Sequence, residues 1–325
     1  MALDSTALTG GTGPEVARAL SEDAAAGRAD DSGRRGARTP RRPFGVWFRQ
    51  TGWRHLIGIV MLVFCAFPLL YVLSAALNPG GTLLTANGLF RTFSLESFTR
   101  LFENPTQPFA AWFVNSMVIG LATAIGTVFL GALAAYSFSR MRFTGRRIGL
   151  LSLLLVQMFP QLLAFVAIFL LMSTIADIFP AIGLNTQVGL IMVYLGGALG
   201  VNTYLMYGFF NTVPMSIDEA AKIDGAGHAR IFFTIILRLV APILAVVGLL
   251  SFIATLNDFV IASVVLVDTD KQTLAVGLYR LVSEETAANW SLFAAGAVLS
   301  AILPMALFLA LQRYIVGGLT AGSVK

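Results

Sequence analysis

The segment between residues 211 and 238 carries a dense pattern of polar and small residues. Ser216 is followed three residues later by Glu219, the spacing of a capping box, in which each side chain bonds the backbone N–H of the other residue. Asp218 places a negative charge near the positive end of the same helix. Gly225 follows as a stop, because glycine tolerates a left-handed backbone. The segment therefore predicts a short helix, a glycine elbow and a second helix that leads into the next apolar run.

The predicted short helix has a face of small and apolar residues that could bind a partner. Ile217, Ala221 and Asp224 share that face by their spacing of three and four residues, with Ala220 and Ile223 nearby. Two interpretations stay open: a helix lying in the lipid headgroups, or a helix docked in a groove of another protein. Because the apolar face is weak, the composition favours docking.

Residue patterns that perform catalysis or hold a metal are absent from the sequence. No G-x-x-x-x-G-K-[ST] pattern occurs, so the chain has no Walker nucleotide site. One cysteine, Cys65, and two histidines, His55 and His228, are too few for a Cys- or His-based metal site. Nucleophile–base arrangements are also missing. We predict a chain that is not an enzyme and binds neither metal nor cofactor itself, so any ATP chemistry would belong to another polypeptide.

The composition of the 325 residues explains which elements must position these side chains. Hydrophobic residues make up 57% of the chain and charged residues only 12%, against roughly 25% charged in soluble domains. Six apolar runs are long enough for a hydrocarbon core that needs roughly 20 residues, and each is expected to be a helix. They are Leu56–Leu77, Asn115–Phe138, Ile148–Thr174, Val188–Phe210, Leu239–Val267 and Leu292–Leu311. The predicted fold class is an all-α integral membrane protein with six transmembrane helices.

The distribution of basic residues predicts the orientation in the membrane. Of the 22 Lys and Arg residues, 18 lie in the segments on the side of the N-terminus. By the positive-inside rule, both termini are cytoplasmic. Residues 1–47 are rich in Gly, Ala, Ser, Asp and Arg, which predicts a disordered cytoplasmic tail. Residues 48–325 form the predicted transmembrane domain. The small net charge of +5 comes mainly from basic residues that orient the chain in the membrane, and it does not indicate nucleic-acid binding.

Polar residues inside the apolar runs are candidates for lining a cavity. Asp258 is the single Asp, Glu, Lys or Arg within the six runs, and it would lie near the outer end of its helix, in a structural or a substrate-lining role. Gln157 and Gln161 flank Pro160, which should bend the third span. Their side chains either line a cavity for sugar hydroxyls or bond neighbouring helices. Trp112 and Trp290, at span ends, are expected to be interface anchors.

The run Glu219–Ala226 (EAAKIDGA) and the downstream frame to Pro242 resemble the EAA loop of ABC-importer permeases. Asn115-Ser116, Ala134-Ala135-Tyr136 and Arg140 with Gly145 resemble the core of the same permeases. Thr273–Gly277 and the C-terminal run from Gln312 resemble the carbohydrate type of this family, in particular its maltose/maltodextrin branch. The resemblance covers residues from about 50 to 325. One departure is Arg238, which stands where the family has proline, so the bend into the fifth span would depend on Pro242.

The resemblance implies a permease of the type I ABC-importer fold, with a core over about 111–315 and a cytoplasmic coupling helix. It implies the following ATPase-coupling residues: Ser216, Glu219, Ala220, Ala221, Asp224, Gly225 and Ala226. It also implies that the loop before the last span meets a sugar-binding protein, with these candidate contacts by position: Arg280, Glu284, Glu285 and Asn289. Residues 283–286 of this loop differ from those of the family. Which residues of the loop contact a binding protein therefore stays open.

The partners that the resemblance implies are a second permease subunit, two copies of a cytoplasmic ATPase that binds ATP and Mg, an extracytoplasmic sugar-binding protein, and the lipid of a bacterial-type inner or plasma membrane. The implied substrate is a maltose/maltodextrin-like oligosaccharide. Three alternatives remain: an importer for trehalose or another glycoside, a gradient-driven secondary transporter, and a membrane enzyme. The last two are disfavoured because ion-coupling groups and catalytic clusters are missing.

Overall fold

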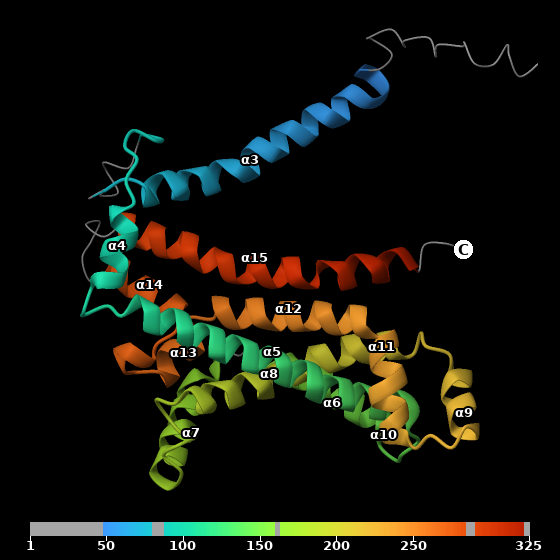
Figure 1. Cartoon of the computed structure of the whole chain (residues 1–325). Coiled ribbons are helices and arrows are strands. Elements are labelled where there is room, and N and C mark those ends of the chain that lie inside the picture. Colours follow the sequence, from blue (N-terminus) through green and yellow to red (C-terminus); the bar gives the residue numbers. More distant parts are fainter. Residues whose placement is uncertain (1–47, 80–87, 160–162, 284–289, 322–325) are drawn as a thin grey trace, which may run out of the picture. The chain divides into compact units, whose positions relative to one another are not determined.

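A computed structural model describes residues 48–79, 88–159, 163–283 and 290–321, and within these ranges every regular element is helical (Figure 1). The predicted tail, residues 1–47, lies outside the described residues. The chain divides between Cys65 and Ala66, inside helix α3, into two compact units. The predicted boundary between residues 47 and 48 stays a prediction. All of the following contacts lie within the second unit.

The first, second and fourth apolar runs form helices whose bounds lie within six residues of those predicted, whereas the sixth helix continues ten residues beyond its predicted end at Leu311. The helices of four or more residues in the described part are α3 (Trp53–Ala76), α4 (Glu96–Glu103), α5 (Phe109–Arg140), α6 (Arg146–Gln157), α7 (Phe165–Ile178), α8 (Gln187–Phe210), α9 (Met215–Ile223), α12 (Ala241–Asn257), α13 (Val260–Val265), α14 (Leu274–Ser283) and α15 (Trp290–Ala321), with π-helical turns η1 (Phe48–Gly52) and η4 (Ile231–Ile236).

Four helices of the described part are long and apolar enough to cross a membrane: α3, α5, α8 and α15. A fifth crossing results if His228–Leu239 and α12, which meet at a bend of 79°, are counted as one span. The chain is therefore a multi-pass membrane protein, and the predicted number of six spans stays a prediction.

The third and fifth apolar runs are interrupted. The third consists of α6 and α7, and Pro160 and Gln161 between them lie outside the described residues. The fifth was predicted as one helix over Leu239–Val267, and this is wrong: α12 ends at Asn257, Asp258 has an extended backbone (ψ 122°), and α13 begins at Val260. The Asp258 carboxylate accepts the Ala262 backbone N–H at 3.0 Å, so it satisfies a donor of α13 that would otherwise lack a partner.

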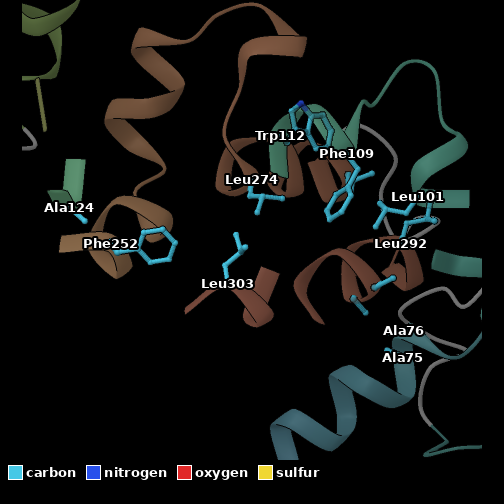
Figure 2. Packing of buried hydrophobic residues seen from close by; sticks show 13 residues of the cluster. Ala75, Ala76, Leu101, Phe109, Trp112, Ala124, Phe252, Leu274, Leu292 and Leu303 are labelled. Carbon is cyan, nitrogen blue, oxygen red and sulfur yellow. The ribbon is translucent and has the colours of Figure 1, made fainter. Parts of the chain in front are cut away.

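Helix α5 is central to the packing of the second unit. It packs against α8 on one side and α12 on the other, and α12 packs in turn against α15 (Figure 1). Near the start of α5, one hydrophobic cluster joins α5 to α4, α12, α14 and α15 (Figure 2). Near its end, a second cluster joins α5 to α8, α9, η4 and α12. A third cluster packs α7, α8 and α13 together.

Trp112 was predicted to anchor the helix at the membrane interface, and this is wrong. The residue is 0% exposed and belongs to the first cluster, near Phe109 (Figure 2). Its indole N–H donates to the Thr269 carbonyl at 2.6 Å. A Cβ atom added at Gly277 would lie 2.2 Å from the indole ring, so the close approach of α14 to Trp112 requires glycine there.

Candidate functional site

Helix α9 is the predicted short helix, but its first turn differs from the prediction. The helix begins at Met215, with Pro214 as the N-cap residue and no side-chain capping bond. The predicted capping box between Ser216 and Glu219 is therefore wrong. Pro214 has an extended backbone (φ −58°, ψ 137°), and its carbonyl accepts the Ile217 N–H at 3.3 Å, so the chain turns into the helix before Ser216.

The end of α9 has the predicted geometry. Gly225 has φ +80°, which is the left-handed conformation that glycine adopts without strain. The Gly225 N–H donates to the Lys222 carbonyl at 3.0 Å, and the Ala226 N–H donates to the Ala221 carbonyl at 2.9 Å. These two bonds form a Schellman motif. The elbow fixes the direction in which the chain leaves α9.

The face of α9 that the spacing suggested for a partner is the one that packs against the chain's own core. Ala221 is 7% exposed in the second hydrophobic cluster, and Ile217 packs against the same cluster. The opposite face is exposed, and Ile223 is 87% exposed on it. The exposed members of the predicted coupling set are Ser216, Glu219, Ala220, Asp224 and Gly225, while Ala226 is half-buried. A partner would therefore meet this second face.

A buried ion pair connects α9 to the end of α5. The Arg140 Nε atom lies 3.0 Å from the Asp218 Oδ2 atom, and the two side chains are only 5% and 7% exposed. Arg140 also donates through Nη2 to the Val213 carbonyl at 2.8 Å. The neighbouring Ser139 hydroxyl donates to the Asn211 side-chain oxygen at 2.8 Å. We call these five residues the α9 clamp.

The stretch after Gly225 bends before it joins α12. His228–Arg230, η4 and Leu237–Leu239 run together and meet α12 at 79°. The bend lies at Val240, and Pro242 occupies the first turn of α12, where its missing N–H costs no bond. Arg238 is thus accommodated before the bend, which needs no proline directly after Leu237.

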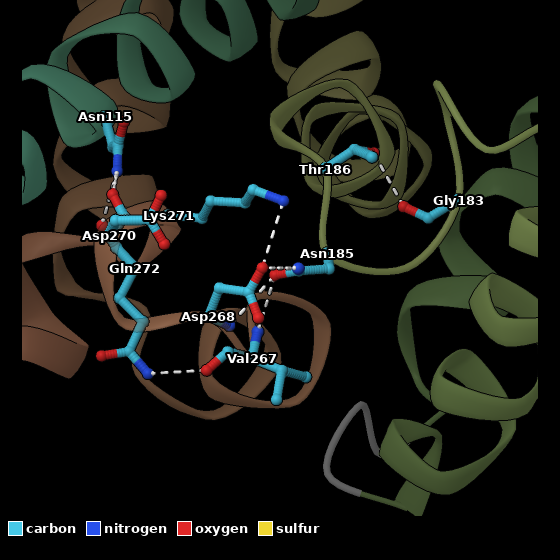
Figure 3. Close-up of polar contacts among 9 residues, drawn as sticks. All are labelled: Asn115, Gly183, Asn185, Thr186, Val267, Asp268, Asp270, Lys271 and Gln272. Atoms are coloured by element: carbon cyan, nitrogen blue, oxygen red, sulfur yellow. Dashed lines mark hydrogen bonds and ion pairs between the residues drawn. The ribbon is translucent and has the colours of Figure 1, made fainter.

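The opposite end of α5 holds a loop through neutral hydrogen bonds. The Asn115 amide donates to the carbonyls of Asp270 (2.8 Å) and Gln272 (3.1 Å), and its oxygen accepts from the Gln187 amide at 2.7 Å. The Ser116 hydroxyl accepts the Leu274 N–H at 2.7 Å. Figure 3 shows Asn115 pointing at the 270–272 backbone. We call Asn115, Ser116 and the segment Thr269–Leu274 the α14 clamp.

A further set of polar contacts lies beside the α14 clamp (Figure 3). Asn185 has φ +62°, and its side chain accepts the Val267 and Asp268 N–H groups and donates to the Asp268 carboxylate. Lys271 forms an ion pair with the same carboxylate at 3.2 Å. The Asn185 hydrogen bond and the Lys271 ammonium lower the pKa of Asp268 below its usual value.

The candidate contacts for a binding protein are only partly described. Arg280 is half-buried, and its guanidinium donates to the Thr269 hydroxyl at 2.6 Å and to the Gln272 side-chain oxygen at 3.3 Å. These two hydrogen bonds support the chain's own loop. Glu284, Glu285 and Asn289 lie outside the described residues.

Gln157 and Asp258 line one cavity of ≈ 320 Å³ between α5, α6, α8 and α12. Its other polar lining residues are Thr123, Tyr194, Asn202, Ser251 and Thr255. The Tyr194 hydroxyl donates to Asp258 at 2.9 Å, and the Gln157 amide donates to the Gly197 carbonyl. The Thr123 hydroxyl is buried and has no hydrogen-bond partner among the described residues. Gln161, the third candidate, lies outside the described part.

A larger cavity of ≈ 470 Å³ lies between α5, α12 and α15, and its walls are apolar apart from Tyr314. Burying sugar hydroxyls there would leave them without partners, which is costly. The smaller polar cavity is therefore the better candidate for a polar solute. In the described part of the chain, no three His, Cys, Asp or Glu side chains come together as metal ligands.

The family comparison identifies the kind of protein to which the chain is similar. Residues 127–320 match the family described as "Binding-protein-dependent transport system inner membrane component". This range contains α9, the α9 clamp and the cavity lining except Thr123, and it leaves out the first half of α5.

Several curated proteins are similar over most of their length. The galactooligosaccharides transport system permease protein GanQ of Bacillus subtilis is 40% identical over 272 residues, 83% of this chain and 94% of that protein. The maltodextrin permease MdxG of the same organism is 39% identical, over 83% and 93%. The maltose/maltodextrin permease MalG of Escherichia coli is 38% identical, over 83% and 94%.

Two solved structures have a similar fold. A bacterial ABC transporter that imports the acidic polysaccharide alginate contains a chain with a TM-score of 0.68 and 21% identity, covering 85% of this chain and 99% of that one. The alginate transporter in complex with its pentasaccharide-bound periplasmic protein gives a TM-score of 0.59 and 14% identity, covering 84% and 96%.

Proposed function

Because the chain belongs to the family of inner membrane components of binding-protein-dependent transport systems, and is a sugar ABC-transporter permease, we propose that it imports a maltose/maltodextrin-like oligosaccharide at the expense of ATP. The chain is a transport component rather than an enzyme. ATP and Mg would bind to two copies of a partner ATPase, and a second permease subunit would complete the pathway.

The exposed face of α9 is the observation on which the coupling role rests. A two-turn helix that leaves Ile223 almost fully exposed beside Glu219 and Ala220 has apolar area available for a partner. The end of α5 that carries α9 would face the cytoplasm, together with both chain termini. Closure of the ATPases would shift the population between inward-open and outward-open states by moving α9.

The polar cavity is the proposed place where this chain meets the sugar. Gln157, Asn202 and Asp258 offer amide and carboxylate groups of the kind that bond sugar hydroxyls. The buried Thr123 hydroxyl would gain a partner from a bound hydroxyl. The loop from Arg280 onward would meet the extracytoplasmic sugar-binding protein. Among the relatives are maltodextrin and galactooligosaccharide permeases, so the linkage of the sugar is a matter for experiment.

The coupling role is tested with the reconstituted complex of this chain, its partner permease, the ATPase and the binding protein. Gly225→Asn keeps a left-handed backbone accessible and adds a side chain at the docking elbow, where no atom lies within 4 Å of an added Cβ. We expect binding-protein-stimulated ATP hydrolysis to fall about tenfold, which corresponds to roughly 1.4 kcal/mol.

The matched control is Gly145→Asn. Gly145 also has positive φ (+90°) and open space around an added Cβ, but it lies between α5 and α6. Its variant should keep stimulation within about twofold, or roughly 0.4 kcal/mol. Unchanged stimulation in Gly225→Asn, or an equal loss in both variants, would contradict the coupling role.

The substrate is tested in the same preparation with sugar-loaded binding protein. Maltodextrins should stimulate ATP turnover, while galactooligosaccharides and trehalose should not. If one of these other sugars stimulates and maltodextrins fail, the maltodextrin proposal is wrong although the transport proposal stands. If ATP turnover responds to no loaded binding protein and sugar uptake follows an ion gradient instead, the chain is a secondary transporter.

A further inference from the structure

The contact between α9 and the rest of the chain is small, and one buried ion pair provides its charged part. Ile217 and Ala221 contribute the apolar contact with the second hydrophobic cluster. Asp218 is the one charged residue of α9 that is buried, and it pairs with Arg140 at 3.0 Å. The Nε and Oδ2 atoms meet as an ion pair without hydrogen-bond geometry. Apolar contacts are non-directional, whereas separating two buried charges would leave each of them uncompensated.

Arg140 holds the connection into α9 as well as α9 itself. Its Nη2 atom donates to the Val213 carbonyl at 2.8 Å, one residue before Pro214. Ser139 holds Asn211 at the start of the same connection. Two consecutive residues at the end of α5 therefore bind both the connection that leads into α9 and the helix itself.

Helix α5 is continuous from this clamp to the α14 clamp. It runs over 32 residues from Phe109 to Arg140, a length of roughly 48 Å at 1.5 Å per residue. Its other end holds the Thr269–Leu274 segment through Asn115 and Ser116. It also packs beside α8 and α12, which line the polar cavity. A movement of α9 that is transmitted to α5 therefore reaches both the cavity and the α14 clamp.

We infer that Arg140 and Asp218 are positioning residues that make α9 and α5 move as one body, so that ATP hydrolysis at the docked partner produces transport. This inference rests on the proposed function, in which α9 docks on the ATPase. Without the pair, α9 still docks and responds to the ATPase, but α5 no longer follows it. Hydrolysis then continues while less sugar crosses per ATP.

The experiment measures the sugar transported per ATP hydrolysed, with the complete complex in proteoliposomes. Asp218→Asn is nearly isosteric and removes the charge; we expect this ratio to fall about fivefold or more, the lower end of typical coupling free energies. Asp177→Asn removes an exposed carboxylate from α7 of the same chain and should leave the ratio within about twofold. A ratio in Asp218→Asn equal to that of Asp177→Asn would overturn the inference.

A rescue variant separates positioning from mere loss of charge. Arg140→Met combined with Asp218→Leu replaces the ion pair with apolar side chains that can hold α9 on α5, since buried ion pairs often tolerate such replacement. The ratio should return to within about twofold of the unmodified chain. A double variant that assembles normally but stays as uncoupled as Asp218→Asn would overturn the positioning role.

Failure of folding and failure of the proposed function are both recognised in the same experiment. Should Asp218→Asn fail to assemble, Arg140→Lys takes its place. This variant keeps the buried charges balanced but removes the planar guanidinium, which contacts Asp218 and Val213 at the same time. An unchanged ratio in Arg140→Lys overturns the inference. If the unmodified complex shows no ATP turnover in response to any loaded binding protein, the proposed function itself is contradicted.

Discussion

The two ends of α5 are both fixed by side chains of that helix, but with different chemistry. At the α9 clamp, a charged pair that is more than nine-tenths buried connects α5 to a helix whose other face is exposed. At the α14 clamp, the amide of Asn115 and the hydroxyl of Ser116 bind backbone groups of a loop packed on Trp112. Helix α9 is thus attached at few points, of which one is a buried charge pair, whereas the loop is attached by several hydrogen bonds.

Removing one partner of the ion pair should have the largest effect on stability. Arg140→Gln leaves the Asp218 carboxylate buried without its cation, and breaking a buried pair in this way costs about 3–5 kcal/mol. Because the pair is buried, salt should change this loss little. Thermal unfolding of the purified chain in detergent measures it. A loss below that of Asn115→Ala would reverse the comparison between the two clamps.

At the other clamp, Asn115→Ala removes three side-chain hydrogen bonds at a residue that is 8% exposed. Each of the three bonds contributes about 1 kcal/mol, so we expect a loss of about 3 kcal/mol. Asn78→Ala, which removes a single exposed bond from Thr92, should cost about 0.5 kcal/mol or less. Equal unfolding temperatures for the two variants would contradict the assigned importance of Asn115.

The smallest effect is expected from pH at the polar contacts beside the α14 clamp. The folded state lowers the pKa of Asp268, so its contribution to stability is present above the unfolded pKa and is lost as pH falls through the folded pKa. The pH range over which this stability is lost therefore begins near the ordinary carboxyl pKa of about 3.9 and extends below it. Asp268→Asn should remove this pH dependence, and a difference from the unmodified chain that grows toward lower pH would contradict the assignment.

The sequence was sufficient for the class of fold and for the location of α9. Hydropathy predicted α3, α5, α8 and α15 because lipid forces a continuous helix on an apolar run. The elbow at Gly225 was predictable because few other residues adopt positive φ. The start of α9 was not, since Pro214 turns the chain earlier than Ser216.

The features that the sequence analysis missed depend on contacts between residues far apart in the chain. Asp218 was interpreted as a charge for the helix dipole, and nothing local reveals that Arg140, 78 residues earlier in the numbering, is its partner. Asn185 and its bonds to the 267–268 backbone also escaped notice. A signal for Asn185 exists: asparagine is among the residues that tolerate its left-handed backbone.

The central claim, that the exposed face of α9 docks on the ATPase, is tested most directly by cross-linking from Ile223. In a chain with Cys65→Ser, a photoreactive thiol probe is attached to Ile223→Cys, and the complex is irradiated in native membranes. We expect a cross-link to the ATPase subunit from this position and none from Ile125→Cys, whose site is exposed on the middle of α5. Labelling of lipid alone from Ile223→Cys, or ATPase labelling from both positions, would contradict docking of the exposed α9 face on the ATPase.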